Sequence, residues 1–336
     1  MALMLAACDD RAARTPFTDS RIPPGLAARD WPPAGWAWGL IQIDGHPPQR
    51  YGVAAPASAP RAQVLILPGY GAAAEDAFPL ASALIDRGYE IWTLDGAGQG
   101  GSGRSASPRD LGHVEDFAPD LTAIDRLIVL AIRPRPQTPL VLIADRTTAL
   151  IALRRMQMGA PVAGAVLRAP SGQTPGGAWA QGWLGGLIVQ WAQRLGLGAV
   201  RAPWGYGWSR LGRDIGGGDA AAQTASAWRR TDAPLRMGGP SFGWIKAFAD
   251  LRASFDRSPL RPVTAPVLML AAGRDEPRDE ALRDRLCAAL PHCVQGHAES
   301  EASADEQIIA FIEQVRSRTS GAPNPQAPAH SSQARR

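Results

Sequence analysis

Lysine is almost absent from this sequence of 336 residues, in which Lys246 is the only one. The arginines that carry the rest of the positive charge are scattered along the chain, and 35 basic residues against 31 acidic ones leave a formal net charge of only +4. Because a nucleic-acid surface needs clustered cations, the sequence predicts no nucleic-acid partner.

Long apolar runs are lacking as well. The longest uncharged stretch, residues 169–193, is interrupted by Gly, Pro and Gln, whereas a bilayer span needs about 20 predominantly apolar residues. No group of His, Cys, Asp and Glu has the spacing of a metal site, and we expect neither a metal nor another cofactor. What is present is a chain that is 45% hydrophobic, which is ample for a packed globular core.

Cysteine is scarce too. The sequence has three cysteines, and the first of them ends the sequence Leu5-Ala6-Ala7-Cys8. This motif resembles the bacterial lipobox, in which the cysteine becomes lipidated. The apolar stretch before Cys8 is short and has no basic residue, as in a shortened signal. We expect an exported lipoprotein, attached to a membrane on the periplasmic side, and a cytoplasmic protein is the alternative. Proline-rich residues up to Gly35 are expected to form a linker.

Cys287 and Cys293 are separated by few residues. Their spacing permits a disulfide in an oxidising compartment but does not demand one. A disulfide and two buried thiols therefore both remain open.

Apolar runs and amphipathic stretches alternate along most of the chain. Residues 36–43 and 50–54 are expected to form an antiparallel hairpin around Gly45. Further strands are expected at 64–67, 91–94, 140–144, 163–167, 267–270 and near 294, and helices at 75–87, 115–131, 147–158, 280–290 and 305–315. Apolar strands without alternation, separated by such helices, indicate the α/β class, with a mostly parallel sheet covered on both faces.

The alternation stops near residue 171 and resumes near 265. We expect residues 36–170 and 265–318 to form the core, and the Trp- and Gly-rich residues 171–264 to form a cap. Residues 1–35 are the expected signal remnant and linker. Residues 319–336, rich in Pro, Ser, Gln and Ala, are expected to be a disordered tail.

Glycine-rich turns follow the first two parallel strands, Pro68-Gly69-Tyr70-Gly71 and Asp95 to Ser102. Ligands of parallel sheets bind at such strand ends. The turns resemble the His-Gly-x-Gly and Asp-x-x-Gly-His-Gly-x-Ser motifs of the α/β-hydrolases of the monoacylglycerol lipase and lysophospholipase type, a serine aminopeptidase-like family. The resemblance covers roughly residues 36–315. It implies an α/β-hydrolase fold with a helical cap insertion and carboxylic-ester hydrolysis.

The same resemblance implies roles for four further residues. Asp275 and His297 fall where the family places the acid and the histidine of its catalytic triad. The backbone N–H groups of Tyr70 and Thr147 would be the oxyanion-hole donors.

The nucleophile departs from the family pattern. The resemblance places a serine at a sharp turn after the strand 140–144, where this chain has Arg146. A guanidinium stays protonated and cannot attack a carbonyl. Ser241, within Gly-Pro-Ser-Phe-Gly, and Asp145 are the alternative nucleophiles, although no buried strand precedes Ser241 and Asp145 lies one position early.

Trp179, Trp183 and Trp191 recur at helical spacing within the expected cap. Their shared face either packs on the core or, with Ser241, lines a groove for an acyl chain or similar lipid-like ligand. Arg146 at the floor of that groove would favour an anionic head group. The competing interpretation is an ion pair from Arg146 to Asp145 or Asp275.

The sequence supports three hypotheses about function. We favour a hydrolase-derived pseudoenzyme that binds a small lipid-like acyl ligand. The alternatives are an active carboxylic-ester hydrolase, which uses a non-standard nucleophile or a water activated by His297, and a structural or partner-binding lipoprotein. The oligomeric state is left open.

Overall fold

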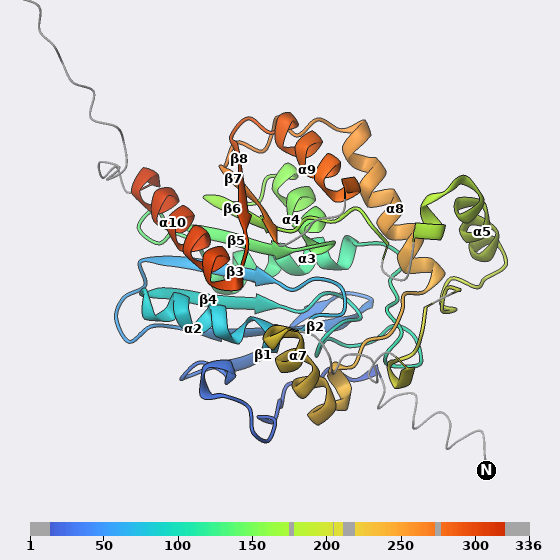
Figure 1. Cartoon of the computed structure of the whole chain (residues 1–336), viewed down its shortest axis with the longest axis horizontal. Coiled ribbons are helices and arrows are strands. Elements are labelled where there is room, and N and C mark those ends of the chain that lie inside the picture. The colour runs from blue at the N-terminus through green and yellow to red at the C-terminus, as the bar shows by residue number, and fades with distance from the viewer. Residues whose placement is uncertain (1–13, 175–177, 204, 211–218, 273–276, 320–336) are drawn as a thin grey trace, which may run out of the picture.

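The computed structural model of the chain describes residues 14–174, 178–203, 205–210, 219–272 and 277–319. Its centre is an eight-stranded sheet with the order β1-β2-β4-β3-β5-β6-β7-β8 (Figure 1). The strands are β1 (Ala37–Ile43), β2 (His46–Ala54), β3 (Ala62–Leu67), β4 (Tyr89–Leu94), β5 (Leu140–Asp145), β6 (Gly164–Arg168), β7 (Val267–Ala272) and β8 (Cys293–Ala298).

Helices follow most of the parallel strands. The α-helices are α2 (Phe78–Asp86), α3 (Ala118–Leu127), α4 (Thr148–Gln157), α5 (Trp183–Arg194), α7 (Ala220–Thr231), α8 (Phe242–Arg257), α9 (Pro277–Ala289) and α10 (Glu301–Thr319). Shorter turns are η1 (Ala28–Asp30), η2 (Ala74–Ala77), η3 (Ile128–Ile132), η4 (Ala178–Gln181) and η6 (Ala233–Leu235).

The pairing of the strands agrees with the sequence pattern. β1 and β2 form the expected antiparallel hairpin, and β2 pairs antiparallel with β4. All other neighbours, from β4 to β8, are parallel. The predicted α/β fold class is confirmed.

Two hydrophobic cores lie on opposite faces of the sheet, because successive residues of a strand point to opposite faces. Val64 of β3 belongs to the core formed with α2 and α10, which pack through residues such as Leu84 and Ile308. Its neighbour Leu65 belongs to the core formed with α3, α4, α8 and α9, which includes Phe248. The sheet is thus a central layer between two layers of helices (Figure 1).

Several helix ends differ from the sequence expectation because local capping sets them. α3 begins at Ala118 rather than near residue 115; its N-cap residue Phe117 makes no side-chain cap bond, and the preceding Asp116 carboxylate accepts the Ala118 N–H at 2.8 Å. α10 begins at Glu301 rather than 305, after Ser300 and Ser303 each accept the other's N–H at 3.2 Å. Hydrophobic periodicity shows which face is buried, but it does not show these caps.

Between β6 and β7 the chain leaves the sheet and forms η4, α5, α7, η6 and α8. We call residues 169–266 the β6–β7 insertion. α8 packs on α4, and α5 packs on α8 at the side of the molecule opposite α10 (Figure 1).

Residues 14–35 lie along the body instead of forming a free linker. The Phe17 N–H donates to the Gly101 carbonyl at 2.7 Å. Arg21 donates to the Asp232 carboxylate through its backbone N–H at 2.9 Å and through Nε at 3.3 Å. Phe17 and Leu26 also pack against an apolar cluster beside α7. The expected linker is therefore wrong for these residues, because their apolar side chains find partners in the folded body.

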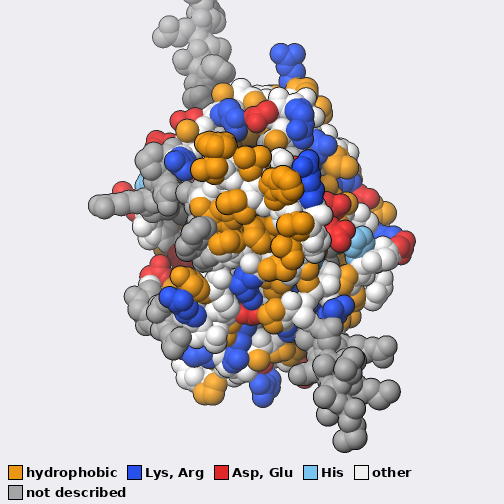
Figure 2. All heavy atoms as spheres, turned by 90° about the vertical axis from the view of Figure 1, so that its right-hand side faces the viewer, with side chains coloured by type: hydrophobic (Ala, Val, Ile, Leu, Met, Phe, Trp, Pro, Cys, Tyr) orange, Lys and Arg blue, Asp and Glu red, His pale blue; other side chains and the backbone are white. Residues whose placement is uncertain are grey.

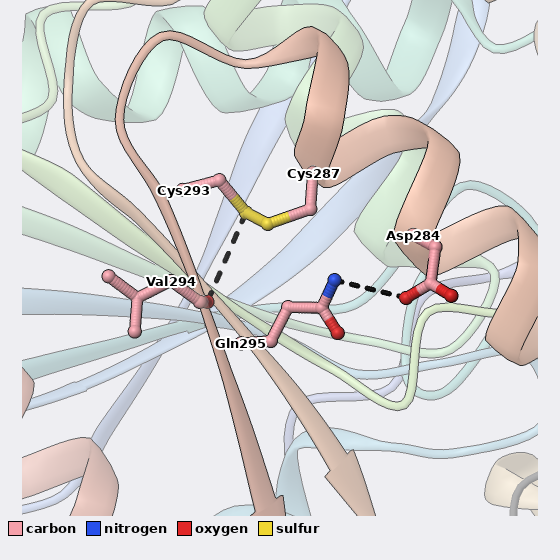
Figure 3. Close-up of a disulfide and its surroundings, with 5 residues drawn as sticks. All are labelled: Asp284, Cys287, Cys293, Val294 and Gln295. Atoms are coloured by element: carbon pink, nitrogen blue, oxygen red, sulfur yellow. Dashed lines mark hydrogen bonds between the residues drawn. A yellow bond between two sulfur atoms is a disulfide. The ribbon is translucent and has the colours of Figure 1, made fainter.

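Cys287 and Cys293 form a disulfide, with Cα atoms 5.3 Å apart (Figure 3). The bond joins α9 to the first residue of β8, and Gln295 Nε2 donates to Asp284 Oδ1 at 3.0 Å between the same two elements. Of the two alternatives, the structure thus shows the disulfide. Cys8 and residues 320–336 lie outside the described residues.

Candidate functional site

Arg146 lies at the turn between β5 and α4. Its backbone is left-handed, with φ at 50°, a conformation that is unfavourable for a residue with a Cβ. Two hydrogen bonds hold the turn: the Arg146 N–H donates to the Arg168 carbonyl at 2.9 Å, and the Ser171 N–H donates to the Arg146 carbonyl at 3.2 Å. The result is the sharp strand-to-helix bend that characterises a nucleophile elbow.

The guanidinium of Arg146 is exposed and has no side-chain partner among the described residues. Asp145 accepts two hydrogen bonds from Arg168 instead, at 2.5 Å each. The structure therefore contradicts an ion pair between Arg146 and Asp145, and it leaves neither Asp145 oxygen free as a nucleophile. Asp275, the other partner considered, lies outside the described residues.

The turn that follows β3 lies against this bend. A Cβ at Gly69 would lie 3.2 Å from the Asp145 carbonyl oxygen and 3.5 Å from the Arg146 Cβ, so a glycine suits this close approach. The Tyr70 N–H donates to Thr147 Oγ1 at 3.4 Å. The structure thus brings together the two residues expected at the oxyanion hole. α4 begins at Thr148, directly after these residues, and the N–H groups of a first helical turn favour an anion.

The loop that follows β4 contacts the turn that follows β3. Gln99 Oε1 accepts the Gly71 N–H at 3.0 Å. Asp95 belongs to an ion cluster with Arg50 and Glu75 in which the side chains are fully buried. Arg50 donates through Nε to Asp95 at 2.7 Å and through both terminal nitrogens to Glu75 at 2.8 Å. The cluster thus connects β2 with the residue that follows β4 and with η2, which follows the oxyanion turn.

The side chain of Tyr70 joins the oxyanion turn to the insertion. Its hydroxyl donates to the Gly238 carbonyl at 3.0 Å, and its ring lies 4.7 Å, centroid to centroid, from that of Trp244 in α8. Burial raises the pKa of Tyr70 far above its ordinary value, so the phenol stays neutral.

His297 lies within β8 rather than after it, because the strand continues to Ala298. Its side chain is exposed, and its Cα pairs with that of Ala271 in β7. In the sheet, β6 and β7 lie between β5, which precedes Arg146, and β8. Because Asp275 lies outside the described residues, the structure does not test the triad, and the roles of Asp275 and His297 stay predictions.

Ser241 is fully buried, at 0% exposure, and caps the first turn of α8. Its Oγ accepts the Trp244 N–H at 3.1 Å and lies 2.8 Å from His113 Nδ1. Burial lowers the pKa of His113, which favours the neutral imidazole. With φ at −80°, Ser241 is not on a left-handed bend. Sequence reasoning missed His113, because nothing in the chain links it to a serine so distant.

α5 turns its large side chains outward. Trp183 is 76% exposed and Trp191 58%, whereas the buried face contains small residues such as Gly185 and Val189. The interpretation that the tryptophan face packs on the core is therefore wrong for Trp183 and Trp191: the helix packs through its smaller residues, which allow the closest approach. Trp179 belongs to η4, before α5, and packs against the core, partly buried, as that interpretation predicts. Substrate binding by these tryptophans and by Ser241 stays a prediction.

A cavity of about 490 Å³ opens between the chain after β6, α8 and α9. Charged groups around it bond to their neighbours: Arg285 donates to Asp256 at 2.8 Å, and Asp279 accepts the Gly172 N–H at 3.0 Å. This cavity is polar and does not match the apolar groove expected for an acyl chain.

The part of the chain that the structure describes contains no group of three or more His, Cys, Asp or Glu side chains placed to hold a metal ion. Within the same residues, no helix combines the length and the apolar character needed to cross a bilayer.

A family model, described as serine aminopeptidase S33, matches residues 58–301. The chain belongs to this family. Lysophospholipase L2 of Escherichia coli K12 is 25% identical to this S33-family chain over 240 residues. That match covers 65% of this chain and 65% of the relative, slightly less than two thirds of the relative's length.

Solved structures share the fold of this S33-family protein. A soluble variant of monoglyceride lipase from Saccharomyces cerevisiae has a TM-score of 0.59 at 15% identity, covering 89% of this chain and 99% of that one. The monoacylglycerol lipase of Paleococcus ferrophilus has a TM-score of 0.57 at 17% identity, covering 79% and 98%. Together with the family match, this likeness confirms the α/β-hydrolase fold that the motifs predicted.

Proposed function

We propose that this S33-family protein is a hydrolase-derived binding protein for a small acyl ligand with an anionic head group, and that it does not form an acyl-serine intermediate. The position of Arg146 carries the proposal. It occupies the left-handed bend, at φ 50°, on which such folds present a nucleophile, and its guanidinium cannot attack a carbonyl.

The surroundings of Arg146 support an anionic head group. Asp145, the nearest carboxylate in sequence, is bound by Arg168 and does not neutralise Arg146. The free cation and the N-terminus of α4 lie together, and each favours a carboxylate or phosphate. The acyl part of the proposal rests on the lysophospholipase and monoglyceride lipases that this chain resembles.

An active ester hydrolase is the second candidate, and the Ser241–His113 pair favours it. A serine and a histidine at 2.8 Å are within the reach that nucleophilic catalysis needs. Against it, Ser241 is fully buried, and its Oγ already accepts the N–H of Trp244. A substrate carbonyl would reach Ser241 only after α8 had moved.

The oxidised pair Cys287–Cys293 supports a further part of the proposal, export to an oxidising compartment, where disulfides persist. Attachment through lipidated Cys8 belongs to the same proposal.

Oleate, an acyl chain with a carboxylate, is a direct probe of the Arg146 site. We expect calorimetry to show binding by the native protein and affinity about 10- to 100-fold weaker for Arg146→Gln, because the lost charge-assisted hydrogen bonds contribute about 1.5–3 kcal/mol. Arg133→Gln is the matched control, since Arg133 is also exposed and has φ at 51°. Its affinity should equal that of the native protein.

Labelling with a fluorophosphonate separates the candidate functions. We expect no labelled serine in the native protein. Labelling that His113→Ala abolishes would instead identify Ser241 as a nucleophile, and labelling that His297→Ala abolishes would identify a triad that includes His297. Absence of both labelling and oleate binding would reject the binding protein in favour of a structural lipoprotein.

A further inference from the structure

Large apolar side chains gather on the outer face of α5 and on the turn that follows it. They are Trp183, Leu184, Leu187, Ile188, Trp191 and Leu195, each 44–76% exposed. Figure 2, which faces the side of the molecule where α5 lies, shows apolar side chains gathered there into a broad patch. Contiguous apolar patches larger than a few hundred Å² are uncommon on monomeric proteins and mark interaction sites.

The charged residues of the chain segment that contains this patch have one sign, although Arg201 of this segment pairs with Asp110 from outside it at 2.9 Å. Every charged residue from Arg146 to Arg213 is an arginine. Arg194, exposed at the end of α5, lies 5.7 Å from the centroid of the Trp191 ring. Arg210, also exposed, lies 3.8 Å from the ring of Tyr206. The patch therefore combines aromatic and aliphatic side chains with cations and has no acidic residue of its own.

We propose that α5 docks on an anionic lipid bilayer and lies in the plane of the interface. Indole rings prefer the level of the head groups, and guanidinium groups there bind lipid phosphates. An amphipathic helix with an apolar face of this kind lies in the interface without spanning it. This docking does not depend on the ligand proposed for Arg146.

The charge distribution favours a lipid surface over a second copy of this chain. In a symmetric dimer the same patch would meet itself, and the arginines of both copies would be brought together without an acidic partner from this segment. Anionic lipids supply the missing opposite charge.

Cosedimentation of the full chain with vesicles tests the proposal. All proteins carry Cys8→Ala, so that no attached lipid contributes. We expect binding to vesicles of phosphatidylglycerol and phosphatidylcholine, weaker binding to phosphatidylcholine alone, and weakening by salt. Trp183→Ala/Trp191→Ala should reduce affinity by about tenfold or more, which corresponds to a loss of at least about 1.4 kcal/mol. Arg194→Gln should reduce binding only to vesicles that contain phosphatidylglycerol.

A matched control removes exposed apolar side chains elsewhere. Trp31 and Leu130 are 42% and 59% exposed and lie outside the insertion, so Trp31→Ala/Leu130→Ala should bind as the native protein does. Circular dichroism confirms that each variant is folded. Absence of binding by the native protein, or equal binding by Trp183→Ala/Trp191→Ala, would overturn the proposal. A dimer in light scattering that Trp183→Asp converts to a monomer would assign the face to a second copy.

Discussion

Asp120, in α3, shows at the scale of one residue how burial changes a carboxyl group. Its Oδ1 accepts the Ala97 N–H at 2.9 Å, whereas its buried Oδ2 has no partner among the described residues. Desolvation raises the pKa of Asp120 to about 7, and the charge of Asp116 adds to the rise. The folded protein therefore keeps a proton on Asp120 that the unfolded chain releases near pH 4.

This difference makes stability depend on pH. Between about pH 4 and pH 7 the unfolded chain binds fewer protons than the folded one at this site, so the free energy of unfolding falls as the pH rises. Urea unfolding at pH 4.5 and pH 7 should show a loss of a few kcal/mol from this residue, and Asp120→Asn should remove that loss.

Asp250→Asn is the control for this measurement, because Asp250 is exposed and pairs with Lys246 at the surface. It should keep the native dependence on pH. An unchanged slope in Asp120→Asn would show that Asp120 ionises in the folded protein much as it does in the unfolded chain.

Sequence reasoning reached only part of the chemistry of single residues. Arg146 could be located because a predicted strand and a predicted helix flank it. Its unpaired state could not be predicted, because Asp145 is bound by Arg168 from a different strand. The burial of Arg50 could not be predicted from the sequence either, because one arginine in a strand is usually solvated. In the structure it is fully buried between two carboxylates.

At the scale of elements, the disulfide holds α9 to β8 at the edge of the sheet (Figure 3). We expect Cys287→Ser/Cys293→Ser to lower the free energy of unfolding by about 2 kcal/mol, because the loop that the bond closes is short and restricts the unfolded chain only moderately. Urea unfolding measures the loss. Dithiothreitol should reproduce it in the native protein and leave the double variant unchanged, and equal stability of the two proteins would contradict a formed disulfide.

Sequence patterns predicted the central elements better than the peripheral ones. β3 and β5 were predictable because a strand covered on both faces is apolar throughout. α5 was predicted as a helix with a shared apolar face, but the pattern does not show what covers that face. Close packing through Gly185 and Val189 decided its orientation, and that depends on η4, outside the helix itself.

At the scale of the whole molecule, residues 14–35 join parts that are distant in the sequence. They reach the loop after β4 through Phe17 and the end of α7 through Arg21. Composition suggested a linker, because a proline-rich segment has little regular structure of its own. Its partner Asp232 lies some two hundred residues away, so no local pattern could reveal the contact.

Removing this segment should destabilise the protein. A chain that begins at Trp36 loses the packing of Phe17 and Leu26, and we expect its free energy of unfolding to be lower by about 2 kcal/mol, since complete burial of an apolar side chain contributes about 1.5–3 kcal/mol and these two are partly buried. A chain that begins at Arg14 keeps these contacts and is the control. Thermal and urea unfolding of both chains test this, and equal stability would show that the segment contributes nothing to the fold.

The place of α5 has a consequence for how a ligand is supplied. α5 packs on α8, and Trp244 of α8 contacts Tyr70, so the helix proposed to dock and the bend at Arg146 belong to the same end of the molecule. With α5 in the interface, an amphiphile would arrive by lateral diffusion within the leaflet. Its mole fraction among the surrounding lipids, and not its solubility in water, would then set the occupancy of the site.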